Sequence, residues 1–270
     1  MTNFLIGFPD LQAKAVRTQS SNTFSDDTPL KNILGKRGLV SKLAAAATGT
    51  KVIEFDSGAT DTSNYLYLAR TDKLKLASVT TVTIKTGDTS YFAGGAGATT
   101  VSTITLASET LIGPRAVDLL KEYTETTAKR YTWLEFASGA SSSTNDLDSL
   151  FIGKFFDFET EPGSWRIAKR YNSGSEMASG GTGDIKRKGD QRYVINIVWN
   201  NISDSKAKEF MDEAREIYKR RRQFILRSTS PAAILDSKTI LQVEFAELPK
   251  IEKSSPGYNT IYARFIEVLG

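Results

Sequence analysis

The spacing of hydrophobic residues changes within the C-terminal third of the chain, and this stretch is the best specified part of the sequence. From Tyr193 to Trp199 apolar residues occur on both faces of a period-2 pattern, which predicts a strand covered on both sides. From Asp204 to about Arg222 they recur every three to four residues, which predicts an amphipathic helix. Ser203 is a suitable N-cap, and a second strand is expected from Gln223 to Arg227. The pattern indicates a strand–helix–strand scaffold.

Short period-2 segments also fill the first half of the chain, separated by clusters of Gly, Asp, Ser and Thr. The segments are Val52 to Asp56, Asn64 to Arg70, Thr81 to Asp88, Thr99 to Ala107, Tyr131 to Phe136 and Leu150 to Phe158. Many short strands at such spacing favour an all-β sandwich. Arg115 to Tyr123 fits either a short helix or a buried extended segment.

A domain boundary is expected at Glu159 to Ser164, where Pro162 and Gly163 interrupt the pattern. The predicted fold is mainly β, with two β-sandwich domains at residues 1–160 and 161–270, the second packed by one α-helix. Residues 1–45 are expected to be extended, and the pattern leaves open which domain they join. The second domain is expected to contain a long loop from Asn172 to Gly189 and two closing strands, Thr239 to Leu248 and Ile261 to Leu269.

The composition narrows the possible chemistry. The chain contains no cysteine and no histidine, which removes thiolate chemistry, the usual general base near pH 7 and the commonest transition-metal ligand. A net charge of +4 is too small to indicate nucleic-acid binding by itself. No run of about 18 apolar residues occurs, so we expect no membrane insertion. We therefore expect no enzymatic activity, no catalytic residue and no cofactor.

Two residue groups could still suggest a ligand site. The glycine clusters Gly94, Gly95, Gly97 and Gly180, Gly181, Gly183 lack the strand–glycine–helix context of phosphate loops, so flexible loops are favoured. A Ca²⁺ site could be considered among acidic residues of predicted turns. These residues are Asp56, Asp61, Asp72 and Asp88. Their spacing matches no EF-hand loop, and aspartate is a common turn residue, so no metal site is predicted.

Basic residues cluster on both sides of the expected loop in the second domain. They are Arg166, Lys169, Arg170, Lys186, Arg187, Lys188 and Arg192. Three interpretations apply: contact with an acidic protein partner, a solvated hairpin tip, or binding to a nucleic-acid backbone. The balanced overall charge favours the protein partner, so these residues form the predicted partner interface.

Both halves resemble parts of bacteriophage tail proteins. The segments VIEFDSG, SNYLYLAR, TVTIKTGD, RYTWLEF and SLFIGKFFDF resemble the discoidin-like (galactose-binding-like) jelly-roll module of minor tail proteins of long-tailed bacteriophages. The second half, with its strand, amphipathic helix, FILRS strand and two closing strands, resembles the ring-forming domain of phage distal tail (Dit-like) proteins, which is related to the tail-tube fold.

This resemblance implies a structural virion protein of the tail tip or baseplate, made and assembled in the host cytoplasm. It implies an N-terminal jelly-roll and a C-terminal tail-tube-like β-sandwich or barrel. The family forms homo-oligomers, here expected as a hexameric ring, that join the tail tube to hub, tip and tape-measure proteins, with DNA only in transit through the lumen. Many distal tail proteins place the ring domain first, whereas here the tube-like half is C-terminal.

An alternative function is carbohydrate binding by the jelly-roll, in a minor tail protein that contributes to host-surface recognition. Tyr91 and Phe92 are the aromatic residues of its loops that could contact a glycan. An enzyme that uses carboxylates is a third possibility, but the sequence offers no convergent acid and base.

Overall fold

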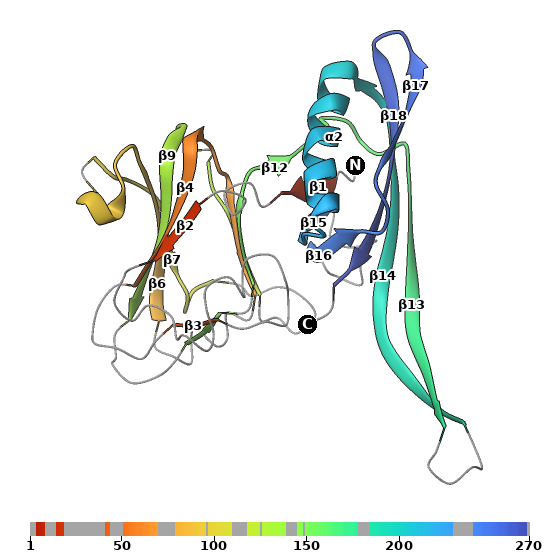
Figure 1. Ribbon diagram of the computed structural model, residues 1–270, viewed down its shortest axis with the longest axis horizontal. Helices are drawn as coiled ribbons and strands as arrows, with labels where there is room; N and C mark the ends of the chain where they lie inside the picture. Colours follow the sequence, from red (N-terminus) through yellow and green to blue (C-terminus); the bar gives the residue numbers. More distant parts are fainter. Residues whose placement is uncertain are drawn as a thin grey trace.

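The protein has two lobes, as the computed structural model shows in Figure 1. The structure describes residues 4–8, 15–18, 41–43, 51–69, 79–95, 97–109, 118–124, 126–138, 145–147, 149–177, 184–228 and 240–268. Strands dominate both lobes, and the fold is mainly β as the sequence predicts. We call the two parts the sandwich lobe and the sheet–helix lobe.

Two antiparallel sheets face each other in the sandwich lobe. The first contains, in order, β2 (Ala15–Thr18), β4 (Lys51–Asp61), β9 (Lys129–Ser138), β6 (Val79–Gly87) and β7 (Thr99–Thr105). The second contains β11 (Leu150–Gly153), β5 (Tyr65–Leu68) and β8 (Leu119–Glu122), and a small pair joins β3 (Ser41–Leu43) to β10 (Asn145–Leu147). Alternate residues such as Phe55, Leu134 and Leu66 fill the space between the two sheets. This arrangement confirms the predicted jelly-roll sandwich, and β8 shows that residues 119–122 are extended.

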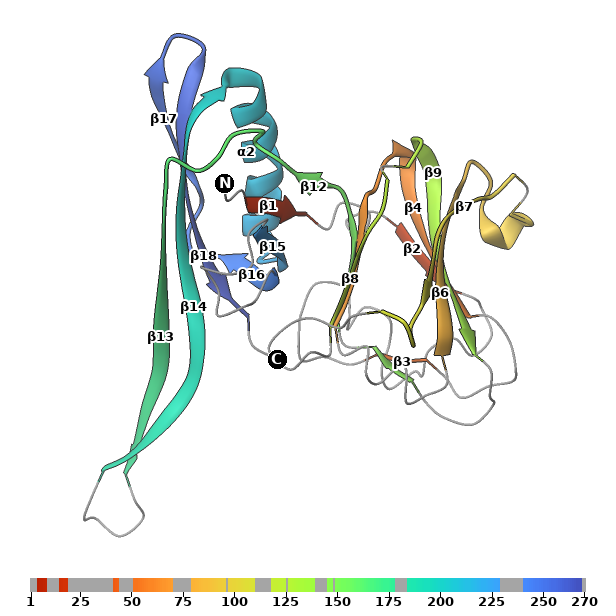
Figure 2. The same ribbon diagram turned by 180° about the vertical axis from the view of Figure 1, so that it is seen from behind.

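An eight-stranded antiparallel sheet with a helix on one face forms the sheet–helix lobe (Figure 2). Its path is β12 (Phe155–Phe156), β1 (Phe4–Gly7), β15 (Phe224–Ser228), β16 (Ile240–Phe245), β18 (Tyr258–Glu267), β14 (Asp184–Ser203) and β13 (Ser164–Met177). β17 (Lys250–Ser255) pairs with β18 outside this path. Helix α2 (Asp204–Lys219) begins where the sequence predicts, because the Ser203 side chain accepts a hydrogen bond from the Lys206 amide.

The N-terminal strand belongs to the sheet–helix lobe, a point that the sequence left open. In β1, Phe4 lies opposite Ser228 of β15, and Ile6 lies opposite Phe156 of β12. The lobe is therefore built from two separate stretches of chain, with the sandwich lobe inserted between β1 and β12. The chain changes lobe between β11 and β12, a few residues before the boundary expected at residue 160.

The prediction of a loop from Asn172 to Gly189 is wrong for residues 172–177 and 184–189, which are strands. β13 and β14 pair as a long hairpin, with Tyr171 opposite Gln191 and Met177 opposite Asp184. The sequence of residues 172–177 and 184–189 is mostly polar at both odd and even positions, so it shows no apolar alternation that could indicate extended structure. The Gly180 cluster lies outside the described residues.

A second apolar cluster joins the two lobes. Tyr65, Tyr67 and Phe151 of the sandwich lobe pack with Phe155 and Ile225 of the sheet–helix lobe.

Two polar contacts reinforce this joint. The Tyr65 hydroxyl donates to the Phe8 carbonyl at 2.8 Å. Arg227 lies 2.6 Å from the Glu122 carboxylate, and Glu122 belongs to β8 of the sandwich lobe. Apolar burial and these contacts together hold the lobes in one relative orientation.

Phe210 of α2 is the centre of an aromatic cluster in the sheet–helix lobe. Its ring centroid lies 6.1 Å from Phe8, 5.6 Å from Phe156 and 5.0 Å from Phe158. The Phe210 side chain is fully buried. This one residue therefore connects the helix with both chain stretches that frame the sandwich lobe.

Replacing this ring tests that role. We expect Phe210→Ala to lower the free energy of unfolding by about 3–5 kcal/mol, because it removes a large buried side chain and leaves a cavity. Tyr218→Ala on the same helix removes a ring that is 42% exposed and should change stability by less than about 1 kcal/mol. Urea denaturation followed by circular dichroism measures both, and equal losses would contradict the central position of Phe210.

Candidate binding surfaces of the two lobes

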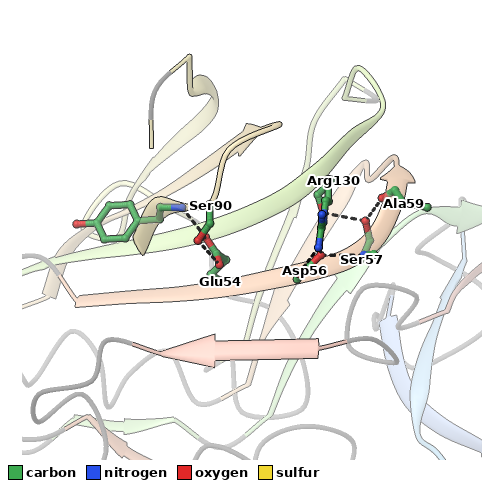
Figure 3. A network of polar contacts seen from close by, with 8 residues as sticks. Glu54, Asp56, Ser57, Ala59, Ser90 and Arg130 are labelled. Atoms are coloured by element: carbon green, nitrogen blue, oxygen red, sulfur yellow. Dashed lines mark hydrogen bonds and ion pairs between the residues drawn. The ribbon is translucent and has the colours of Figure 1, made fainter. Parts of the chain in front are cut away.

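A buried carboxylate anchors a loop at one end of the sandwich lobe (Figure 3). Glu54 lies in the middle of β4 and is fully buried, which is unusual for a glutamate. The Ser90 hydroxyl lies 2.9 and 3.0 Å from its two oxygens, and the Tyr91 amide donates to it at 2.6 Å. The carboxylate therefore holds residues 90–91 against the outer face of the sheet.

Residues 90–95 form a tight turn, which we call the apex turn, around the 3₁₀ segment η3 (Tyr91–Ala93). Ser90 caps it, because its side chain also accepts a hydrogen bond from the Phe92 amide at 3.2 Å. Gly94 closes it with φ of 102°, a left-handed conformation that side chains disfavour. Gly94 therefore serves to form a tight turn, and this turn is held in place by the Glu54 carboxylate.

The apex turn places the two predicted glycan-contacting aromatics differently. Phe92 is 40% exposed, while Tyr91 is half-buried beside the indole of Trp133, with ring centroids 6.1 Å apart. The two rings meet edge to face at 5.3 Å. Phe92 can therefore offer a ring surface to a ligand, and Tyr91 mainly supports it.

A second polar group lies on the same sheet, where β4 and β9 pair (Figure 3). Asp56 accepts hydrogen bonds from Arg130 Nε at 2.9 Å, from Arg130 Nη2 at 3.1 Å and from the Gly58 amide at 2.9 Å. This bidentate contact raises the pKa of Arg130 above its usual value. The Ser57 hydroxyl contacts the carbonyl oxygens of Ala59 and Arg130. Asp56 is therefore a structural anchor.

Of the aspartates considered for calcium, the two with described side chains each pair with a basic residue. Asp56 binds Arg130, and Asp88 pairs with Lys129 at 2.5 Å. The Asp61 side chain and all of Asp72 lie outside the described part of the structure. Within the described residues, no cluster of three or more Asp, Glu, His or Cys side chains could hold a metal ion. No helix there is long and apolar enough to cross a membrane.

The structure brings the predicted basic residues together on one hairpin. Arg166 lies opposite Asn196, Lys169 opposite Tyr193 and Arg170 opposite Arg192, while residues 186–188 lie opposite Ser175 to Ser173. Arg166 is exposed and Arg192 is half-buried. The side chains of the other five basic residues lie outside what the structure describes. The predicted interface residues therefore lie on two paired strands, where the sequence predicted the two flanks of a loop.

Sequence reasoning missed Glu54 and its partners. Glu54 occupies a period-2 position within VIEFD, where a charged residue ordinarily faces solvent. Its burial depends on the apex turn, which follows a different strand and folds back over the sheet. One sequence signal could have pointed to this site: Ser90 precedes two aromatic residues and a pair of glycines, which is typical of a capped turn. A capped turn with two aromatic residues suggests a contact with a polar group elsewhere in the fold.

Comparisons with known proteins give similarities of fold. No protein-family model and no curated protein matches the sequence. Among solved structures, a selenomethionine-labelled mutant of chitosan-binding module 1 from a chitosanase/glucanase of Paenibacillus sp. IK-5 is 16% identical, with a TM-score of 0.40, covering 54% of this chain and 98% of that one. CpGH89CBM32-5 from Clostridium perfringens, in complex with GalNAc-beta-1,3-galactose, is 10% identical, with a TM-score of 0.38. That match covers 54% of this chain and 99% of that chain. Reduced XRCC1 bound to the DNA pol beta catalytic domain is 9% identical, with a TM-score of 0.37. That match covers 52% of this chain and 97% of that chain.

The Glu54 anchor is directly testable. We expect Glu54→Ala to lower the free energy of unfolding by about 1–3 kcal/mol, because it leaves the partly buried Tyr91 amide without its acceptor. Hydrogen exchange at the Tyr91 and Phe92 amides should accelerate. Glu54→Gln keeps one acceptor oxygen and should show the smaller change in both measurements. Unchanged amide exchange in Glu54→Ala would show that the carboxylate does not hold the turn.

Proposed function

We propose that this protein is a structural component of a bacteriophage tail, a ring-forming adaptor of the distal tail type. One lobe builds the oligomer, and the other is carried on the outside of the ring. The resemblance of the second half to ring-forming domains suggested this function. The feature of the fold that supports it most is the part of the β13–β14 hairpin that extends beyond the pairing of β14 with β18.

Residues 169–177 and 184–193 form a two-stranded ribbon, which we call the arm. β14 pairs with β18 only from Val194 onward, so along the arm its sole described strand partner is β13. At the base of the arm Tyr193 is buried in the body of the lobe, and its amide donates to the Glu267 carboxylate of β18 at 3.0 Å. Figures 1 and 2 show the arm running past the body of the lobe. Nine residues of strand span about 30 Å.

The arm has a physical need for a partner. A two-stranded ribbon without a third strand or a packing face is at best marginally stable in water. The outer edge of β13 also has no strand beside it among the described residues, and such edges invite pairing with another chain. A ring satisfies both needs, because each subunit can receive the arm of the next one.

The charge of the arm specifies the kind of surface that would receive it. Its sequence carries six basic residues, of which Lys186, Arg187 and Lys188 are consecutive. Three acidic residues, Glu176, Asp184 and Asp190, offset them only in part. An acidic surface on a neighbouring subunit, tube protein or hub protein is therefore the complementary partner.

Charge reversal on the arm tests assembly. The triple variant with Lys186→Glu, Arg187→Glu and Lys188→Glu should keep the native circular dichroism and melting temperature, because these residues lie beyond the packed body. It should lose incorporation into rings when mixed with purified tail-tube and hub proteins, as measured by co-sedimentation and negative-stain imaging.

The matched control reverses charge on the exposed face of α2, with Lys208→Glu and Arg215→Glu, and should assemble normally. If the wild-type protein never joins tube and hub proteins, the adaptor function is wrong. If the arm variant assembles as well as wild type, the arm is not the contact.

Carbohydrate binding by the sandwich lobe is a second candidate, favoured by the apex turn. Phe92 presents an exposed ring on a turn fixed by the Glu54 anchor, so little ordering is needed on binding. Arg130, which is about half-exposed, offers hydrogen-bond donors on the same sheet, and its neighbour Lys129 pairs with Asp88, two residues before the apex turn. Aromatic faces with nearby polar groups suit sugars, so the lobe could recognise a host-surface glycan.

A glycan array with the purified protein tests this candidate. We expect binding to at least one glycan, lowered by about tenfold or more in Phe92→Ala, which removes the ring surface. Tyr258→Ala in the sheet–helix lobe removes an aromatic residue that is somewhat more exposed, at 48%, and should bind like wild type. Binding that survives Phe92→Ala would exclude the apex turn as the contact.

A further inference from the structure

A pocket of about 410 Å³ lies at the C-terminal end of α2, where the helix end faces β16. It is separate from the arm and from the apex turn. Its polar lining is mostly basic. Its charged lining residues are Lys219, Arg221, Arg222 and Glu244.

Arg221 adopts an unusual backbone conformation at this pocket. Its φ is 49°, in the left-handed region, where helix ends usually have glycine. A side chain there costs about 1 kcal/mol relative to glycine. A strained position that carries a long cationic side chain into a pocket lining suggests that the side chain has a use there.

The basic residues are not needed to cap the helix. Backbone amides already satisfy the last carbonyls: the Arg220 amide donates to Glu216 at 3.2 Å, Arg221 to Tyr218 at 3.0 Å and Arg222 to Ile217 at 3.0 Å. The helix end is therefore closed without any side-chain donor.

The charges around the pocket are unbalanced. Arg220, just outside the lining, pairs with Glu216 at 3.3 Å. Lys219, Arg221 and Arg222 form no ion pair in the described part of the chain. They share the lining with one carboxylate, that of Glu244, so the pocket carries a surplus of two positive charges.

Arg222 is half-buried and lies near Arg220, a further cation just outside the lining. Partial burial lowers the pKa of its guanidinium, and repulsion by Arg220 lowers that pKa further, while Glu216 opposes the change. An anion in the pocket would relieve the repulsion and replace the water that burial removes.

We propose that this pocket binds a terminal phosphate group of a small phosphorylated ligand, a site distinct from the assembly and glycan surfaces. A terminal phosphate carries about two negative charges near neutral pH, which matches the surplus. Arginines bind phosphate through paired, charge-assisted hydrogen bonds. A phosphodiester of a nucleic-acid backbone carries only one charge and fits the surplus less well.

Calorimetric titration of the whole protein with inorganic phosphate and pyrophosphate tests the site. We expect saturable binding of both, at least about tenfold weaker in Arg222→Gln because a charge-assisted hydrogen bond is lost. Arg221→Gly should weaken binding similarly while keeping or raising the melting temperature, since glycine suits the left-handed conformation. Arg215→Gln, on the exposed face of the same helix, is the control and should bind like wild type.

Two comparison ligands identify the chemistry. Citrate and a thymidine decanucleotide without terminal phosphate should both bind more weakly than pyrophosphate. Tighter binding of citrate would reassign the pocket to carboxylates, and tighter binding of the decanucleotide would reassign it to a nucleic-acid backbone. Absence of saturable phosphate binding, or binding unchanged in Arg222→Gln and Arg221→Gly, would overturn the proposal.

Discussion

The aromatic cluster around Phe210 is the contact on which the rest of the structure depends. It brings together Phe8 from the start of the chain, Phe156 and Phe158 from just after the sandwich lobe, and the helix itself. Each ring buries a large apolar area, so the cluster gains free energy only when all three stretches are in place. The inserted lobe must therefore enter and leave the sheet–helix lobe at two neighbouring strands, β1 and β12.

This double connection limits how the lobes can move. Two chain crossings restrict rotation more than a single linker would, and the Tyr65 hydroxyl bonds to the carbonyl of Phe8 beside the same cluster. The apolar contacts between β5 and β15 complete the joint. A surface on the sandwich lobe is consequently held in a defined direction relative to the arm. For a protein that carries a recognition lobe on an oligomeric ring, such rigidity would set where every copy of that lobe points.

Three parts of the molecule have groups that the described residues leave incompletely satisfied. Within the described ranges the arm has no third strand and the pocket at the end of α2 has cations without an ion-pair partner, while Phe92 exposes a ring on a fixed turn. Each would gain free energy from a different partner: a protein surface, a sugar and a phosphate. Their separation on the molecule means that occupation of one need not block another.

The sequence by itself determined the elements whose signal is local. The 3.6-residue period and the Ser203 cap were enough to locate α2, and period-2 segments located the strands of the sandwich, because burial of one face leaves its mark on consecutive residues. It also identified Tyr91, Phe92 and the basic cluster as residue types suited to binding. Only the tertiary structure decided that β1 joins β15, that residues 172–177 and 184–189 pair as strands, and that Glu54 is buried beneath the apex turn. Strand pairing uses backbone groups that nearly every residue has, so a sequence can indicate a strand without indicating which strand it pairs with.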